Sequence, residues 1–261
     1  WSKAPFINLF SSLFFLALRR IRKAIALNLQ PVLGPSSWWA RQGRIWRTMK
    51  NFALCLTERY ESLNRDLELE SIIEGDEYWR QTIGGNRGFI IVTAHIGHWE
   101  VGAHLPALRE GQTVHVVREA EVDPKAQALI RDLMLSMSNG HFQVHFSDEA
   151  DTAFGARLLA ALRRGDIVAL QGDRPRAGGK TATTRMFGRE YPVPLGPAAL
   201  ARAAQVLMIP VFIFREGRAR SRVSIRPPIE VHRTDRDGSL VLRWNRAGLT
   251  LRHRGCGSQP P

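Results

Sequence analysis

The chain has 261 residues and is 44% hydrophobic, which is enough to bury a substantial core in one domain. It has only two cysteines, Cys55 and Cys256, which excludes a disulfide-stapled scaffold and fits a reducing compartment. The formal net charge of +13 calls for an anionic partner, either nucleic acid or a phospholipid or phosphorylated substrate. The sequence has no zinc-finger, RRM-like or helix-turn-helix signature, so nucleic acid is not the expected partner.

An uncharged apolar stretch at residues 5–18 is followed at once by a basic cluster at residues 19–23. This stretch is shorter than the roughly 20 residues that a spanning helix needs. Basic residues beside an apolar segment favour contact with anionic lipid at the cytoplasmic face. Residues 1–23 are therefore predicted to be a membrane anchor, either a truncated transmembrane helix or an interfacial helix. A hydrophobic arm packed on the domain is the alternative.

The rest of the chain alternates between helical and strand-like patterns. Helices are expected over residues 38–65, 153–164 and 198–204 and after residue 124, and a loop over 30–37. Strands are expected over residues 89–94, 113–117, 142–146, 166–170 and 206–214. This order predicts an α/β fold, a single domain over 24–248 with a mixed, largely parallel sheet flanked by helices. Residues 249–261 lack periodicity and are predicted to be disordered.

A cluster of polar residues follows the apolar strand at 89–94. It contains His95, His98, Glu100 and His104. A helix is expected to start near His98, which puts Glu100 in its first turn, where negative charge is favourable. Because the chain folds back at a strand–turn–helix junction, the Glu100 carboxylate can reach the His95 imidazole. A carboxylate-oriented histidine at the carboxyl end of a strand is typical of proton-transfer sites.

The segment GDRPRAGGKT at residues 172–181 is a near miss to the phosphate-binding loop G-x4-G-K-[ST]. Arg174 stands where the first glycine is required, which excludes a nucleoside triphosphatase of that type. What remains is a basic loop after a strand, suited to bind a phosphate or diphosphate. Arg118 likewise follows a predicted strand, so both arginines are expected at the same edge of the sheet.

The sequence AHIGHWE around His95 and Glu100 resembles the H-x4-D/E motif of the lipid A late acyltransferases, which are lauroyl and myristoyl transferases. It is equally similar to the phosphatidylinositol mannoside acyltransferases. The resemblance extends over about residues 40–215. It includes Asp173-Arg174, where the family carries Asp-Gln or Asp-Arg, and Met186-Phe187-Gly188, where it carries Phe-Phe-Gly.

This resemblance implies a glycerolipid-acyltransferase-like fold and a reaction. The reaction would transfer a fatty acyl group from a thioester donor, acyl carrier protein or coenzyme A, to a hydroxyl of a lipid or glycolipid such as a lipid A precursor. The thioester is a co-substrate, and no further cofactor is expected. The enzyme would work at the cytoplasmic face of the bacterial inner membrane, which its N-terminal helix would contact.

Each candidate residue has an expected role in that reaction. His95 is the general base for the acceptor hydroxyl, and Glu100 fixes its tautomer and stabilises the imidazolium. Arg118 and Arg174 are expected to bind anionic groups of acceptor or donor, and Asp173 to orient Arg174. Backbone N–H groups at residues 97–99 are candidates for stabilising the oxyanion.

Two other function classes remain open at the level of sequence. A zinc hydrolase could use His95, His98, Glu100 and His104 as metal ligands, although a helix between His95 and His104 makes their convergence difficult. A non-catalytic basic module that binds membranes or nucleic acid accounts for the charge but not for the polar cluster.

Overall fold

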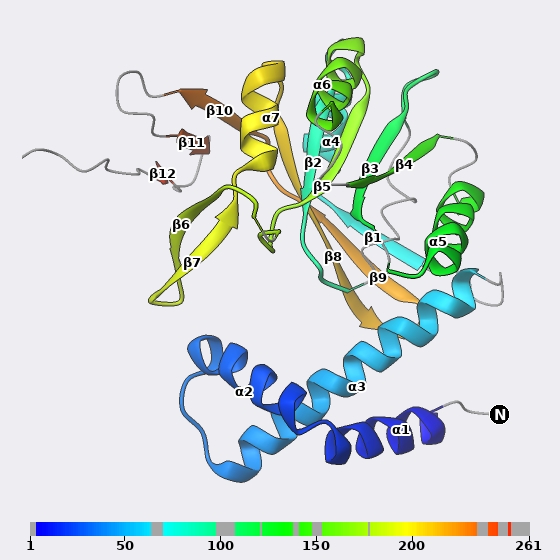
Figure 1. Cartoon of the computed structure of the whole chain (residues 1–261), viewed down its shortest axis with the longest axis vertical. Coiled ribbons are helices and arrows are strands. Elements are labelled where there is room, and N and C mark those ends of the chain that lie inside the picture. Colours follow the sequence, from blue (N-terminus) through cyan, green and yellow to red (C-terminus); the bar gives the residue numbers. More distant parts are fainter. Residues whose placement is uncertain are drawn as a thin grey trace, which may run out of the picture. The chain divides into compact units, whose positions relative to one another are not determined.

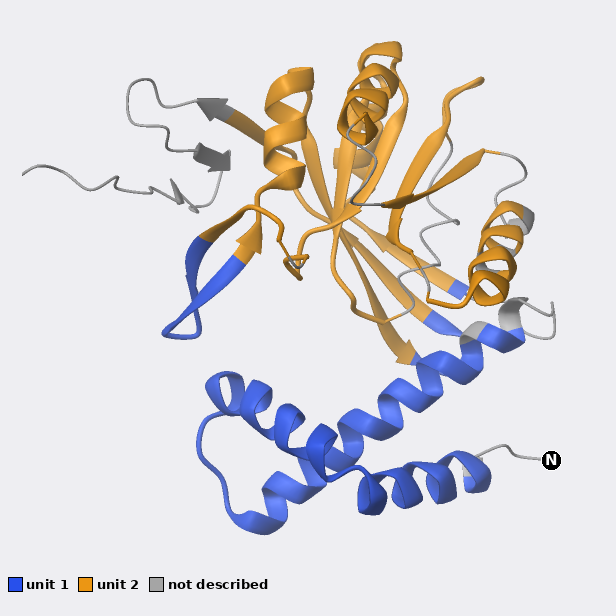
Figure 2. Cartoon of the chain, in the orientation of Figure 1, with its two compact units in different colours: residues 1–70, 183–192, 217–220 blue, residues 71–182, 193–216, 221–261 orange. Residues whose placement is uncertain are grey.

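The computed structural model (Figure 1) describes residues 4–63, 70–97, 108–120, 122–137, 141–147, 153–176, 178–233, 240–244 and 250–251. The chain forms two compact units, shown in different colours in Figure 2. The first comprises Trp1–Glu70, Thr183–Pro192 and Gly217–Arg220. The second comprises Ser71–Ala182, Val193–Glu216 and Ser221–Pro261. The α/β class and the largely parallel sheet predicted from the sequence are confirmed.

The first unit is built mainly from three helices, α1 (Ala4–Ala17), α2 (Arg19–Leu33) and α3 (Trp38–Leu63). The indole of Trp46 in α3 donates a hydrogen bond to the Ser12 hydroxyl of α1 at 3.2 Å. The loop predicted over residues 30–37 is wrong in its first half, because α2 continues through Pro31. Proline removes one backbone donor, and this close to the helix end the loss affects only the last turn.

The predicted anchor stretch is helical, since α1 covers most of residues 5–18. Across the described residues, however, no helix combines the length and apolar character needed to cross a membrane. A membrane role for residues 1–23 stays a prediction.

The second unit is organised around a ten-stranded sheet. Along its main path the strand order is β12-β11-β10-β8-β2-β5-β3-β4, and β9 pairs with β8 and β1. The strands from β8 to β4 run parallel, whereas β10, β11 and β12 are antiparallel. The strands of this sheet are β1 (Glu70–Glu74), β2 (Phe89–Thr93), β3 (Val114–Glu119), β4 (Phe142–Ser147), β5 (Ile167–Gln171), β8 (Met208–Gly217), β9 (Arg220–Ile225), β10 (Ile229–Arg233), β11 (Leu240–Trp244) and β12 (Thr250–Leu251).

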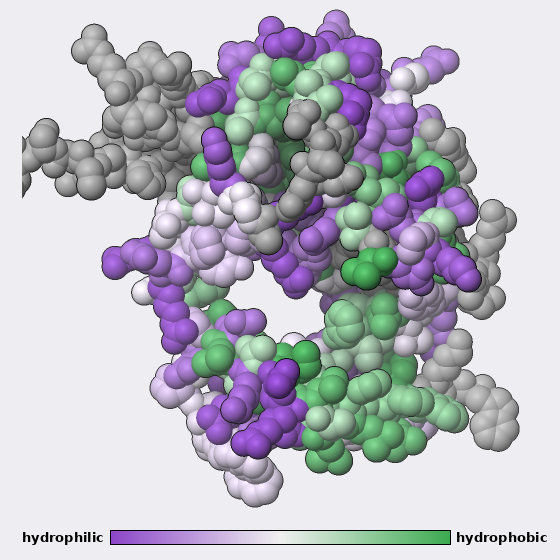
Figure 3. All heavy atoms as spheres, viewed as in Figure 1, coloured by the Kyte–Doolittle hydropathy of each residue, from purple (hydrophilic) through white to green (hydrophobic). Residues whose placement is uncertain are grey.

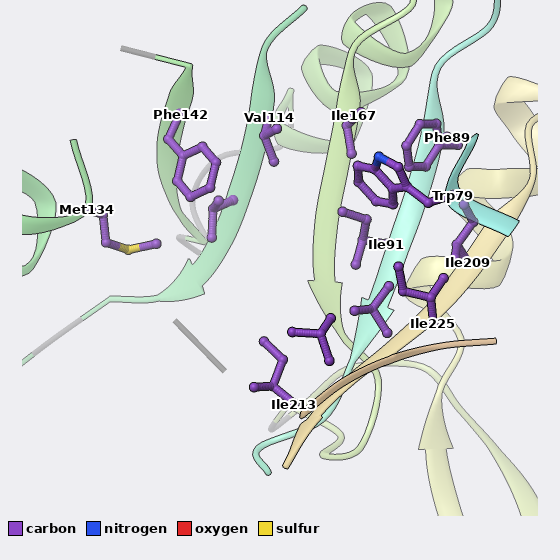
Figure 4. Packing of buried hydrophobic residues seen from close by; sticks show 13 residues of the cluster. Trp79, Phe89, Ile91, Val114, Met134, Phe142, Ile167, Ile209, Ile213 and Ile225 are labelled. Carbon is purple, nitrogen blue, oxygen red and sulfur yellow. The ribbon is translucent and has the colours of Figure 1, made fainter. Parts of the chain in front are cut away.

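Two apolar layers hold helices against the two faces of this sheet. The helices are α4 (Asp76–Ile83), α5 (Pro124–Met137), α6 (Phe154–Arg164) and α7 (Gly196–Ala204). On one face Trp79 of α4 packs edge-on against Phe89 of β2, with ring centroids 5.4 Å apart, and Met134 of α5 joins the same core (Figure 4). On the other face Leu162 of α6 and Ala201 of α7 pack on β2 and β5. Because both faces are covered, β2 is apolar from Phe89 to Val92 and β5 from Ile167 to Leu170.

A separate two-stranded hairpin was not predicted from the sequence. It consists of β6 (Thr181–Met186) and β7 (Arg189–Pro194). Both turn residues, Phe187 and Gly188, have positive φ angles of 52° and 75°, the pattern of a tight hairpin turn. The Met186-Phe187-Gly188 element noted in the sequence therefore ends β6 and forms this turn.

A chain of polar side chains joins Asp166, just before β5, to His115 of β3 and His145 of β4. His115 Nδ1 lies 2.8 Å from His145 Nε2, and His115 Nε2 lies 3.3 Å from a carboxylate oxygen of Asp166. The His115 side chain is only 6% exposed. Burial lowers the pKa of His145 below its usual value, and the neighbouring His115 and Arg157 lower it further. The arrangement therefore favours a neutral His145 imidazole.

Candidate functional site

The candidate site lies where β2 and β5 end side by side. The two strands pair in parallel, with Thr93 opposite Gln171. The amide of Gly172 then donates to the Thr93 carbonyl at 2.9 Å. A Cβ atom on Gly172 would lie 2.7 Å from a methyl group of Val92, so this position favours glycine. The residues that follow each strand, at 95 and 173, are thereby held next to each other.

His95 and Asp173 form a two-point contact. His95 Nδ1 lies 2.9 Å from Asp173 Oδ1, and the backbone N–H of His95 donates to Asp173 Oδ2 at 3.3 Å. Since a carboxylate only accepts hydrogen bonds, the neutral imidazole carries its hydrogen on Nδ1 and its basic lone pair on Nε2. The side chains are 32% and 30% exposed, so solvent and substrate can reach the pair.

The turn after His95 is fixed against β8. Gly97 has a φ angle of +58°, and a Cβ atom there would lie 2.3 Å from the carbonyl oxygen of Ile213. Both the positive φ and this close approach require glycine. The backbone that follows His95 is therefore constrained by the neighbouring strand as well as by Asp173.

Arg174 extends the pair to a third side chain. Its Nε lies 3.9 Å from Asp173 Oδ2, and its side chain is 71% exposed. The Asp173 carboxylate therefore contacts the imidazole on one side and faces the guanidinium on the other. At that distance and exposure the ion pair is weak, which leaves Arg174 able to bind an anionic ligand.

Arg118 lies elsewhere on the same edge of the sheet. It is near the carboxyl end of β3, which is separated from β2 by β5. Its guanidinium contacts the Met134 sulfur of α5 at 3.7 Å. The structure therefore brings His95, Asp173 and Arg174 together and sets Arg118 on a different strand.

Comparison with known families identifies the chain. Residues 4–246 match the bacterial lipid A biosynthesis acyltransferase family, which is nearly the whole chain. The chain belongs to this family. Comparison with curated proteins gave no match. Family membership supports an acyltransferase that acts on a lipid.

Three candidate residues of this acyltransferase, His98, Glu100 and His104, lie outside the described residues. The predicted contact between Glu100 and His95 therefore stays a prediction. Where the chain is described, no group of three or more His, Cys, Asp or Glu side chains could hold a metal ion. The four zinc ligands considered above include three residues that the structure does not describe.

Sequence reasoning missed the carboxylate that contacts His95. Asp173 was expected only to orient Arg174, and Glu100 was expected to orient His95. The sequence did carry a usable signal, because His95 and Asp173 each follow an apolar strand and parallel strands end at one edge. What it lacked was the pairing of β2 with β5.

Two buried polar atoms lie directly before the His95–Asp173 pair. The Thr93 hydroxyl oxygen and the Gln171 amide nitrogen are buried, and neither has a hydrogen-bond partner among the described residues. The two residues are register partners, so their side chains leave the same face of the sheet. An unpaired buried polar group costs about 1–3 kcal/mol. These atoms are therefore expected to bind a water molecule or a polar group of the substrate.

A cavity of about 580 Å³ lies at the other end of the sheet and is not the candidate site. Its walls include Gly88 and Phe89 at the start of β2 and Val206 and Leu207 before β8. Ligands of parallel α/β sheets bind at the carboxyl ends of the strands, which is where His95 and Asp173 lie. The site is therefore assigned to His95 and Asp173 on the basis of their chemistry and position, even though this cavity lies elsewhere.

Proposed function

We propose that the chain is a membrane-associated acyltransferase acting at the cytoplasmic face of the bacterial inner membrane. It transfers a fatty acyl group from a thioester donor, acyl carrier protein or coenzyme A, to a hydroxyl of a lipid or glycolipid such as a lipid A precursor. The observation that carries the proposal is the contact of 2.9 Å between His95 Nδ1 and Asp173. Family membership supports the reaction class.

The proposed chemistry follows from the tautomer that Asp173 selects. His95 Nε2 removes the proton of the acceptor hydroxyl while that oxygen attacks the thioester carbonyl. The negative charge of Asp173 stabilises the imidazolium that results. When the tetrahedral intermediate collapses, the C–S bond breaks and the imidazolium returns the proton to the leaving thiolate. Backbone N–H groups at residues 97–99 are the proposed donors to the oxyanion.

Arginines supply the proposed contacts to anionic groups. Arg174 directly follows Asp173, and its side chain is largely exposed. Its guanidinium group can therefore bind a phosphate of the donor or the acceptor. Arg118 is proposed for a second anionic group, farther along the edge of the sheet. Glu100 stays the sequence-based candidate for a second carboxylate near His95.

Membrane association is supported by the surface of the first unit. Residues 4–57 contain eight Lys and Arg residues and no Asp or Glu. Large apolar side chains of α1 are exposed, among them Phe6 at 67% and Leu16 at 70%. Figure 3 shows hydrophobic atoms gathered over α1 and hydrophilic atoms over α2. An exposed apolar face beside uncompensated positive charge suits the interface of an anionic bilayer.

The decisive experiment measures acyl transfer by the full chain and by His95→Gln. Purified protein in lipid nanodiscs is given an acyl-acyl carrier protein or acyl-coenzyme A and a lipid A precursor, and acylated product is measured by mass spectrometry. Loss of a general base lowers turnover by about 100- to 10,000-fold. His141→Gln, a change at an exposed histidine, serves as the matched control and should keep full activity.

Two results would contradict the proposal. One is acyl transfer that survives His95→Gln at the wild-type rate. The other is thiol release without acylated acceptor that stops on chelation and returns with zinc, which is the behaviour of a zinc hydrolase.

A further inference from the structure

The corner between α2 and α3 encloses a second cavity, separate from the acyl-transfer site. Its volume is about 230 Å³. Its walls come from the last turns of α2, the connection through Gly34 and the first turns of α3, and include Leu27, Leu29, Arg41, Arg44 and Ile45. Pockets for drug-sized ligands span about 300–1,000 Å³, so this one suits a smaller group.

The cavity contains positive charge that no carboxylate of the described residues balances. Arg41 and Arg44 line it, and neither forms an ion pair with a carboxylate that the structure describes. The contact of Arg44 that the structure shows is to the Gly34 carbonyl oxygen at 3.5 Å. By contrast, Arg220 and Arg222 each lie 3.1 Å from a glutamate oxygen. Two guanidinium groups around one cavity, neither paired with a carboxylate in the part of the chain that the structure describes, form a site for an anion.

The surroundings of the cavity indicate where that anion comes from. Trp38 and Trp39, in the first turn of α3, are 54% and 78% exposed and pack edge-to-face with ring centroids 4.4 Å apart. Exposed tryptophans are enriched at the level of lipid headgroups, because one part of the ring is apolar and the other donates a hydrogen bond. The apolar wall formed by Leu27, Leu29 and Ile45 matches the glycerol and first acyl carbons of a lipid.

We infer that this cavity binds the phosphate of an anionic membrane phospholipid. Arg41 and Arg44 hold the phosphate oxygens, and the acyl chains stay in the bilayer beside the two tryptophans. The inference rests on the proposed membrane association and adds to it one defined headgroup site on α2 and α3. At this corner of the first unit the protein would bind one phospholipid headgroup specifically, in addition to the general attraction of its basic residues to an anionic bilayer.

The test measures binding of soluble dihexanoyl phosphatidylglycerol to the full chain. The lipid is kept below its critical micelle concentration, and calorimetry gives the affinity and the stoichiometry. Wild type should bind one lipid per chain, and Arg41→Gln with Arg44→Gln should weaken binding at least about tenfold, because hydrogen bonds to charged groups are stronger than those between neutral groups. The matched double change Arg185→Gln with Arg189→Gln removes the same charge from exposed positions of β6 and β7, outside the cavity. Its affinity should stay within about twofold of wild type, since exposed charges are largely screened.

Other results would overturn the inference. Equal weakening by both double changes would mean that net charge, not the cavity, attracts the lipid. Binding of glycerol 3-phosphate as tight as that of the lipid would make this a site for a soluble phosphate. The absence of saturable lipid binding would remove the site. Acyl transfer is not a readout here, and vesicle binding is measured separately, so failure of the proposed function is distinguishable from failure of this inference.

Discussion

At the scale of single residues, the carboxylate of Asp173 does two things at once. One oxygen contacts the ring of His95 and the other accepts the backbone N–H of the same residue. With about a third of each side chain exposed, such a pair contributes only about 0–1 kcal/mol to stability. The geometry therefore matters more for the orientation and tautomer of His95 than for holding the fold together.

A double-mutant cycle tests whether His95 and Asp173 act as one unit. Asp173→Asn should lower acyl transfer by about 100-fold or more, because an amide can donate to Nδ1 and so favours the wrong tautomer. Adding it to His95→Gln should cause little further loss, since effects within one catalytic unit are non-additive. Turnover is measured for the two single variants and the double variant.

Glu100→Gln serves as the comparison in the same assay. If Asp173 is the partner of His95 Nδ1, Glu100→Gln should cost less than Asp173→Asn. A large effect of Glu100→Gln together with near wild-type activity of Asp173→Asn would return the orienting role to Glu100.

At the scale of elements, the contact between β3 and β4 at the edge of the sheet depends on whether His145 is protonated. His115 of β3 and His145 of β4 share a hydrogen bond of 2.8 Å between ring nitrogens. Only one of those nitrogens can carry a hydrogen, so protonating both rings fully would break the bond. Asp166 contacts His115 and also pairs with Arg164, and Arg157 adds positive charge near His145. The strand pair is therefore held best while His145 is neutral.

Stability should fall in mild acid for this reason. Because the folded state lowers the pKa of His145, the unfolded chain binds more protons below the ordinary histidine pKa of about 6.5. The contribution of His145 is therefore constant above that pH and is lost as pH falls below it. His145→Gln should reduce the loss of unfolding free energy between about pH 7 and pH 5, measured by denaturant titration.

His141→Gln is the control for this measurement. It removes an exposed histidine just before β4 and should leave the pH dependence unchanged. If His145→Gln lost stability with acid as steeply as wild type, the His115–His145 contact would not be the source of the effect.

At the scale of the whole molecule, one stretch of the chain combines net positive charge with exposed apolar side chains. Residues 4–57 carry eight basic residues without an acidic one, while the chain as a whole has 24 Asp and Glu residues. Net charge of this kind governs association with anionic surfaces rather than the fold.

Vesicle flotation tests this prediction. The protein should bind vesicles that contain phosphatidylglycerol more strongly than neutral vesicles, and less at high salt. Phe10→Ser with Phe14→Ser should weaken binding further, because both rings are more than half exposed on α1 and burying them in the bilayer is favourable. Leu129→Ser, at an exposed residue of α5, should have no effect. If the protein bound neutral vesicles as strongly as vesicles that contain phosphatidylglycerol at every salt concentration, the predicted electrostatic attraction would be wrong.

The predictable part of the fold is the part with strong apolar patterns. Phe89 and Ile90 of β2 are at most 1% exposed, and their apolar run predicted the strand. The β6–β7 hairpin was missed because it is largely exposed on both strands and so shows no alternation of apolar and polar residues. Antiparallel additions such as β10 were missed for a related reason, since their pairing is set by tertiary packing.

The site was predictable in part, because His95 stands directly after a strand. Its partner was not, because strand order is not written in a local pattern. Consecutive strands are neighbours about two-thirds of the time, which favours pairing of β2 with β3. In the sheet β5 lies between β2 and β3, and this places Asp173, which follows β5, beside His95.

That insertion of β5 has a consequence for how the enzyme is made. His95 and Asp173 are 78 positions apart, and β3 and β4 are synthesised between them. A ribosome-bound chain that stops before Asp173 has the base but not this carboxylate, and it lacks the strand that joins β2 to β3. Such long-range pairing forms slowly and late. The helices proposed to touch the bilayer leave the ribosome well before this step, so a growing chain can reach its membrane before it can cleave a thioester.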